Sequence, residues 1–115
     1  MGAASPQDRI VWAREALARM QKLKDLMVAV ATGGPRIEAV NADYCAQREE
    51  LHAYLEGLEI ADPNPFDDLW AWYGRWSSGD LPSYQSRRRF LGELFAPLLD
   101  RLRGTEAGRE PAQAR

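Results

Sequence analysis

The chain has 115 residues, 45% of them hydrophobic and 28% charged, with a formal net charge of −2. This length suffices for one domain with its own core, so stability does not require a metal or a disulfide. The slight negative charge argues against a nucleic-acid-binding surface spread over the whole protein, and the single cysteine, Cys45, excludes an intramolecular disulfide and a multi-cysteine zinc site.

Two long helices are predicted in the first half of the chain. Ser5-Pro6 resembles an N-cap followed by proline at the first helical position, and a helix should run from there to about Ala31. The Thr32–Pro35 turn ends it and opens a second helix, from Pro35 to about Leu58. Because this connection is short, the two helices should form an antiparallel hairpin. The predicted inward positions are Ala13, Ala16, Met20, Leu23, Met27 and Val30 in the first helix, and Ile37, Val40, Tyr44, Leu51, Leu55 and Leu58 in the second.

Residues 62–89 concentrate tryptophans and arginines. Asn64-Pro65 followed by two aspartates predicts a helix that begins at Pro65. At about 100° per residue, its apolar side chains share one broad arc, with Trp70 inside the arc and Trp72 at its edge. Trp70 is therefore predicted to be core, and Trp72 to be a partner contact, since an edge tryptophan is typical of interface hot spots. The arc comprises Phe66, Leu69, Trp70, Tyr73 and Trp76.

A fourth helix is predicted from Pro82. Pro97 lies within its apolar pattern and should kink the helix without ending it. Its predicted inward face is Tyr84, Leu91, Leu94, Phe95, Leu98 and Leu102.

The pattern as a whole predicts an all-α four-helix bundle with two long antiparallel helices, a short aromatic helix and a Pro-kinked fourth helix. The bundle should occupy residues 6–103. Residues 1–5 and 104–115 have no periodic apolar positions and are predicted to be disordered.

No catalytic or metal-binding constellation is present. Cys45 and His52 are seven residues apart on one helix, too far for a thiolate–imidazole pair. Glu49 and His52 supply one Glu-x-x-His motif, but a di-metal site needs a second and the chain has only one histidine. Cys45 is expected to be a small buried or half-buried side chain, and His52 a solvated or salt-linked one. The chain is predicted to be non-enzymatic and to bind neither a cofactor nor a metal.

Charge is distributed unevenly along the chain. Residues 35–68 carry two basic and nine acidic side chains, a net −7, whereas residues 69–103 carry six basic and three acidic ones, a net +3. Thirteen of the fifteen basic residues are arginine, which fits bidentate anion recognition but equally a coding bias toward arginine.

The arginine triplet at residues 87–89 admits two interpretations. Arg87 and Arg88 lean toward the core face, while Arg89 points away. In a structural role, Arg87 or Arg88 would pair with Asp67, Asp68 or Asp80; in the other, the triplet would bind an anion near a helix N-terminus. Partner-binding positions on the exposed side are expected at Trp72, Arg75 and Arg89.

The segments PFDDLWAWYGRW and LPSYQSRRRFLGELFAPLL together resemble the all-helical N-terminal domains of AbiJ-type abortive-infection proteins. The resemblance covers about forty residues. It implies a domain that senses an invader and is coupled to a separate effector, commonly a ribonuclease of the HEPN type. The 115 residues leave no room for such an effector, so a free-standing subunit or an excised domain is expected. The nuclease motif is not matched either, because Arg48 and His52 are separated by three residues and the motif needs four to six. The matching positions are Phe66, Leu69, Trp70, Tyr84, Arg87, Arg88, Phe95 and Pro97.

The function predicted from these observations is a protein-interaction module, a sensor, adaptor or small subunit of a bacterial and possibly antiviral multi-protein system, with a separately encoded effector. The first residues lack a signal peptide and the longest uncharged run is about half a membrane span, so a cytoplasmic location without membrane contact is expected. The alternative is a small nucleic-acid-binding subunit that uses Trp72 with Arg75, Arg87, Arg88, Arg89, Arg101 and Arg103.

Overall fold

The structure, a computed structural model, describes residues 5–109. These residues form α-helices and no strand, which confirms the all-α prediction. The helices are α1 (Pro6–Ala31), α2 (Ile37–Leu58), α3 (Leu69–Trp76) and α4 (Tyr84–Glu106). None of these helices is long and apolar enough to cross a lipid bilayer.

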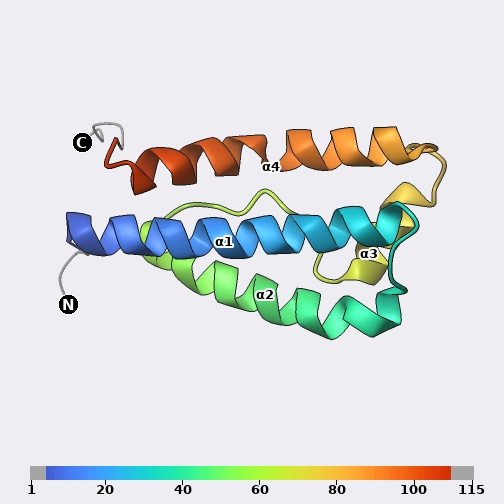
Figure 1. The fold of residues 1–115 in the computed structure, drawn as a ribbon, viewed down its shortest axis with the longest axis horizontal. Coiled ribbons are helices and arrows are strands. Elements are labelled where there is room, and N and C mark those ends of the chain that lie inside the picture. The colour runs from blue at the N-terminus through green and yellow to red at the C-terminus, as the bar shows by residue number, and fades with distance from the viewer. Residues whose placement is uncertain (1–4, 110–115) are drawn as a thin grey trace.

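Helix α1 lies between α2 and α4 and packs against both (Figure 1). Both α2 and α4 run antiparallel to α1, and the short α3 packs against α1 and α2 at the end of the molecule where α4 begins (Figure 1). Every predicted inward position of α1 is buried. In α2 the predicted inward positions are buried too, except Val40, which is half-buried.

The start of α1 is fixed by the predicted cap. The Ser5 hydroxyl accepts a hydrogen bond from the Asp8 backbone N–H (3.0 Å), and the Asp8 carboxylate accepts one from the Ser5 N–H (3.4 Å). At its other end, Gly33 has φ +84°, the left-handed conformation that suits glycine after a helix.

The predicted start of the third helix at Pro65 is wrong. Helix α3 begins at Leu69, and its N-cap is Asp68, whose carboxylate accepts from the Ala71 N–H (2.8 Å). Residues 59–68, which we call the α2–α3 segment, contain no helix. Two X-Pro pairs, at Pro63 and Pro65, disfavour helical geometry in the residues before them.

Hydrogen bonds from α2 hold the α2–α3 segment in place. The Tyr44 hydroxyl donates to the Phe66 carbonyl (2.6 Å) and accepts from the side-chain amide of Asn64 (2.9 Å). The Asn64 side-chain oxygen accepts from the Phe66 N–H (3.0 Å), so Asn64 shapes a turn and does not cap a helix. Ile60, Asn64 and Phe66 are buried there.

Helix α4 begins at Tyr84, with Ser83 as its N-cap, and continues through Pro97 without a break. It ends at Glu106, later than the predicted end at residue 103, and Thr105 in its last turn is buried. The rest of the predicted disordered termini, residues 1–4 and 110–115, lies outside the described residues.

Candidate functional site

The two tryptophans at the start of α3 have the opposite locations from those predicted. Trp72 is fully buried, whereas 50% of the Trp70 surface is exposed. The Trp72 ring stacks on Phe90 (centroids 5.7 Å apart), packs against Phe66 (5.4 Å), and donates its Nε1–H to the Met27 carbonyl (2.8 Å). Trp72 therefore anchors α3 to the core and is not available to a partner, which corrects the prediction for both residues.

The orientation of α3 explains this reversal. The buried side chains Leu69 and Trp72 lie about 60° apart around the helix, and at about 100° per residue Trp70 lies roughly 100° from Leu69 and 160° from Trp72. The arc predicted from the sequence was centred near Tyr73, which is 43% exposed. The sequence signal for the correct start of the helix was Asp68, an N-cap residue directly before Leu69.

The outward face of α3 continues into the start of α4 as one surface of rings and guanidinium groups. Trp70 and Tyr73 meet edge to face (centroids 6.2 Å apart), and so do Tyr73 and Trp76 (4.9 Å). The Arg87 guanidinium carbon lies 4.1 Å from the Trp76 ring centroid and 5.7 Å from that of Tyr84. Arg88 is exposed one helical turn after Tyr84. We call this set the aromatic–arginine surface: Trp70, Tyr73, Trp76, Tyr84, Arg87 and Arg88.

Much of this surface is open to solvent. Tyr73 is 43% exposed and Tyr84 50% exposed, although Tyr84 was predicted to face the core. Trp76 is half-buried, and its Nε1 is buried without a hydrogen-bond partner among the described residues.

The predicted ion pair between the arginine triplet and Asp67, Asp68 or Asp80 is wrong. Arg87 instead donates from Nε to the Leu81 carbonyl (2.9 Å) and from Nη1 to the Ala31 carbonyl (2.9 Å), which ties α4 to the end of α1. Arg88 and Arg89 are exposed and form no ion pair with a described residue.

The three aspartates have other partners. Asp67 pairs with Arg48 (3.3 Å), Asp68 caps α3, and Asp80 pairs with Arg75 (3.3 Å). The Arg75 guanidinium carbon also lies 4.8 Å from the Phe90 ring centroid, so this expected partner-binding residue has internal contacts. Among the residues expected to bind a partner, Arg89 alone is both exposed and without such contacts in the described part of the chain.

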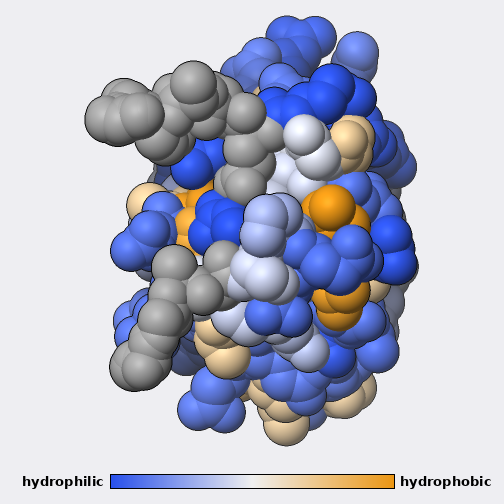
Figure 2. Space-filling model, turned by 90° about the vertical axis from the view of Figure 1, so that its left-hand side faces the viewer, coloured by the Kyte–Doolittle hydropathy of each residue, from blue (hydrophilic) through white to orange (hydrophobic). Residues whose placement is uncertain are grey.

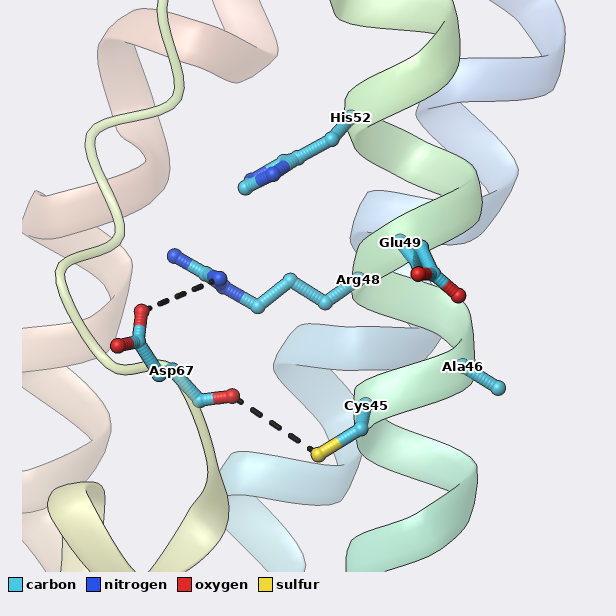
Figure 3. A pocket seen from close by; sticks show the side chains of 6 residues that line it. All are labelled: Cys45, Ala46, Arg48, Glu49, His52 and Asp67. Carbon is cyan, nitrogen blue, oxygen red and sulfur yellow. Dashed lines mark hydrogen bonds and ion pairs between the residues drawn. The ribbon is translucent and has the colours of Figure 1, made fainter.

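A second candidate site is an open pocket of about 510 Å³ between α2 and the α2–α3 segment, lined by Cys45, Ala46, Arg48, Glu49, His52 and Asp67. In Figure 3, Arg48 and His52 extend from α2 toward the segment, while Glu49 turns away. Arg48 also donates to the Asn64 carbonyl (3.1 Å), and His52 Nε2 lies 2.6 Å from the Asp62 carboxylate, as the salt-linked prediction for His52 requires. These side chains hold the segment against α2.

The chemistry of this pocket is limited. Cys45 is half-buried, as predicted, and its Sγ lies 3.8 Å from the Asp67 carbonyl, the contact drawn in Figure 3. Within residues 5–109, no group of three or more His, Cys, Asp or Glu side chains is placed to hold a metal ion. Arg48 and His52 bind residues of the α2–α3 segment, although Arg48 Nε is buried without a hydrogen-bond partner among the described residues. We therefore assign the pocket a structural role.

Nearby, burial raises the pKa of Tyr44 to about 12, although the hydrogen bond from Asn64 acts in the other direction. At neutral pH the Tyr44 hydroxyl is therefore protonated and able to donate to the Phe66 carbonyl.

The opposite end of the molecule differs from this surface in the part that the structure describes. Figure 2 shows the end where α1 begins and α4 finishes, and in the described part hydrophilic side chains predominate there, with hydrophobic atoms only in small separate areas. The aromatic–arginine surface lies at the other end of α1 and α4 (Figure 1).

The structure thus defines an all-helical chain with an exposed aromatic face on its shortest helix. The chain matches no protein family, no curated protein and no solved structure.

Proposed function

We propose that this chain is a non-enzymatic, helical-bundle protein-interaction module. It acts in the cytoplasm as a sensor, adaptor or small subunit of a bacterial multi-protein system, and the effector is carried by a separate chain. The aromatic–arginine surface is its partner-binding site.

The observation that supports this proposal is that α3 buries one of its sides and exposes aromatic rings on the other. The side that carries Leu69 and Trp72 is buried, and the side that carries Trp70 and Tyr73 presents two large rings to solvent. Folding of the chain does not explain these exposed rings, because the buried face already attaches the helix to the core. Contiguous exposed aromatic side chains are typical of surfaces that bind another molecule.

The residue types of the surface favour a protein partner. Tryptophan, tyrosine and arginine are the residues most enriched among interface hot spots. Tryptophan and tyrosine add a large contact area at low entropic cost, and arginine adds several hydrogen-bond donors. Their edge-to-face contacts hold Trp70 and Tyr73 in position before binding, which reduces the ordering cost on association.

The sensor and antiviral parts of the proposal rest on the resemblance to AbiJ-type domains. Of the matching positions, Trp70, Tyr84, Arg87 and Arg88 belong to the aromatic–arginine surface, while Phe66, Leu69 and Phe95 are buried. In the proposed system, partner binding at this surface reports to the separately encoded effector.

The test is binding to the purified products of the neighbouring genes, measured by isothermal titration calorimetry. We expect one of them to bind the wild-type chain, and the double variant Trp70→Ala, Tyr73→Ala to lose at least about tenfold in affinity. Val11→Ala is the matched control, because Val11 is an exposed apolar residue near the far end of α1. Circular dichroism must show that all variants remain folded. Binding that is equal in the wild-type chain and the double variant would refute this site.

A second candidate function is binding of single-stranded nucleic acid. It is favoured by the exposed Trp70 and Tyr73 rings, because Tyr73 contacts Trp76 and Trp76 contacts Arg87 of α4. Arg88 and Arg89 on the same helix form no ion pair with a described residue. Of the arginines predicted for this role, Arg75 and Arg87 have internal partners, whereas Arg88, Arg89, Arg101 and Arg103 are exposed. A gel shift with RNA and DNA at increasing salt tests it, because phosphate-driven binding weakens steeply as salt rises.

A further inference from the structure

The chemistry of the aromatic–arginine surface also indicates what kind of partner it fits. From its arrangement we infer that its ligand is an extended peptide segment of a partner protein that carries acidic side chains next to a proline. This inference rests on the proposed function and deepens it.

The first argument is uncompensated positive charge. Residues 69–91 contain four arginines and one aspartate, a net +3, and the aspartate, Asp80, is paired with Arg75. Arg87, Arg88 and Arg89 are consecutive on α4 and have no carboxylate partner among the described residues. Helix α4 has no acidic residue in its first turn, so its positive dipole end adds to their repulsion.

An anionic partner would compensate this concentration of positive charge. Arginine is well suited to this, because its planar guanidinium group binds carboxylates in a bidentate manner. Arg88 is the best-placed member of the cluster, because it is exposed on the same helical face as Tyr84.

The second argument concerns the geometry of the rings. The Trp70 and Tyr73 rings meet at an interplanar angle of 77°, and the Tyr73 and Trp76 rings at 82°. Successive bases of a nucleic acid stack on aromatic faces, whereas these nearly perpendicular rings present alternating faces and edges. Proline in an extended segment is commonly bound by tryptophan and tyrosine rings, and such rings are exposed here.

The third argument is the charge of the whole chain, −2, with −7 concentrated in residues 35–68. A long polyanion such as nucleic acid would meet this acidic region as well as the arginines. A short acidic segment can bind the arginines alone. The combination of a small positive surface and perpendicular rings therefore favours a peptide.

The experiment is a selection of phage-displayed random peptides of about twelve residues on the full chain, with the folded Trp70→Ala, Tyr73→Ala variant as a counter-selection. We expect the enriched peptides to have net negative charge and to contain proline. Enrichment of basic peptides, of peptides without proline, or of none that depends on these two residues would overturn the inference.

The most enriched peptide is then titrated by fluorescence polarisation. Arg88→Gln should weaken its binding by about tenfold, since one charge-assisted pair to an exposed arginine is lost. The matched control Arg103→Gln, at the far end of α4, should leave binding unchanged. Equal effects of the two variants would show that only net charge matters and would overturn the assigned role of Arg88.

A dT oligonucleotide of about ten nucleotides is titrated in parallel. Tighter binding of the oligonucleotide than of the selected peptide would overturn the inference in favour of the nucleic-acid alternative. If a neighbouring gene product binds through Trp70 and Tyr73 but no acidic peptide is selected, the inference fails while the proposed function stands.

Discussion

At the scale of single residues, the location of each side chain in α3 follows from how much of its ring can be buried. The Trp72 ring contacts Phe66 and Phe90, and its indole N–H donates to the Met27 carbonyl. Trp70 contacts Tyr73 at one edge and leaves half of its surface in solvent. Two tryptophans that are two residues apart therefore contribute very differently to stability.

Trp72→Ala is expected to lower the free energy of unfolding by about 3–5 kcal/mol, through lost burial, a cavity and the loss of the hydrogen bond to the Met27 carbonyl. Trp70→Ala should cost less than about 1.5 kcal/mol, because its site is half exposed. Urea unfolding followed by circular dichroism measures both. Equal losses in the two variants would contradict the assigned locations.

Arg87 stabilises the junction of α1 and α4 without an ion pair. Arg87→Ala should cost about 1–3 kcal/mol, because the Leu81 and Ala31 carbonyls lose their donor. Arg87→Lys should restore only part of this loss, since one ammonium group cannot reproduce a planar donor that also stacks on Trp76. Arg88→Ala is the control, and its effect should lie within about 0.5 kcal/mol of zero. The urea midpoints of the three variants check this ranking.

Tyr44 should make stability depend on pH in the alkaline range. Its folded pKa of about 12 lies above the ordinary value of 10.0, so the unfolded chain loses the proton first. The stabilisation is therefore complete below about pH 10 and is lost as the pH rises toward 12. Urea unfolding of the wild-type chain at pH 9 and pH 11 should show this fall, and Tyr44→Phe should show a smaller one. A fall of the same size in Tyr44→Phe would show that other groups cause it.

At the scale of elements, the α2–α3 segment illustrates how one helix positions another. Along α2, Asn41, Tyr44, Arg48 and His52 all bind residues 62–69, and the Leu69 N–H that opens α3 donates to the Asn41 side chain (2.8 Å). This row of contacts sets where α3 begins, and hence which of its faces is exposed.

The last turn of α4 is held by several contacts. Thr105 is buried, Glu106 pairs with Arg14 of α1 (3.3 Å), and the Arg109 N–H donates to the Gly104 carbonyl (2.7 Å). A chain that ends at Arg103 should therefore melt several degrees below one that ends at Arg109, because about 1 kcal/mol corresponds to 4–8 °C in a domain of this size. Differential scanning calorimetry of the two chains measures the difference. Equal melting temperatures would restore the predicted end of the domain at residue 103.

At the scale of the whole molecule, α1 joins all of the other helices. It packs against α2 on one side and α4 on the other, and it contacts α3 (Figure 1). The side chains that it buries, from Ala13 to Ala31, extend along its length, so neither neighbour has a core of its own.

The chain should consequently unfold in one cooperative transition. Circular dichroism at 222 nm reports all helices, and tryptophan fluorescence reports mainly α3, yet both should give the same urea midpoint. Separate midpoints would show that α3 and the start of α4 unfold independently of the α1–α2 pair. That result would also weaken the case for a preformed aromatic–arginine surface.

The sequence by itself determined the helical class, the two long helices and nearly all of their buried positions. The reason is that a stripe repeated over more than twenty residues fixes the phase of a helix firmly. Capping residues such as Ser5 marked a helix end correctly because they act on backbone groups within a few residues.

The tertiary structure decided the phase of α3 and the partners of the arginines. A helix of 8 residues is too short for its own pattern to fix which tryptophan faces the core, and hydrogen bonds from Asn41 and Tyr44, more than twenty residues away, hold the segment before it and its first residue. Arg87 likewise bonds to a carbonyl 56 residues distant, a contact that no local pattern encodes. The exposed Trp70, Tyr73 and Tyr84, and with them the candidate site, became visible only when these long-range hydrogen bonds fixed the orientation of a helix too short to orient itself.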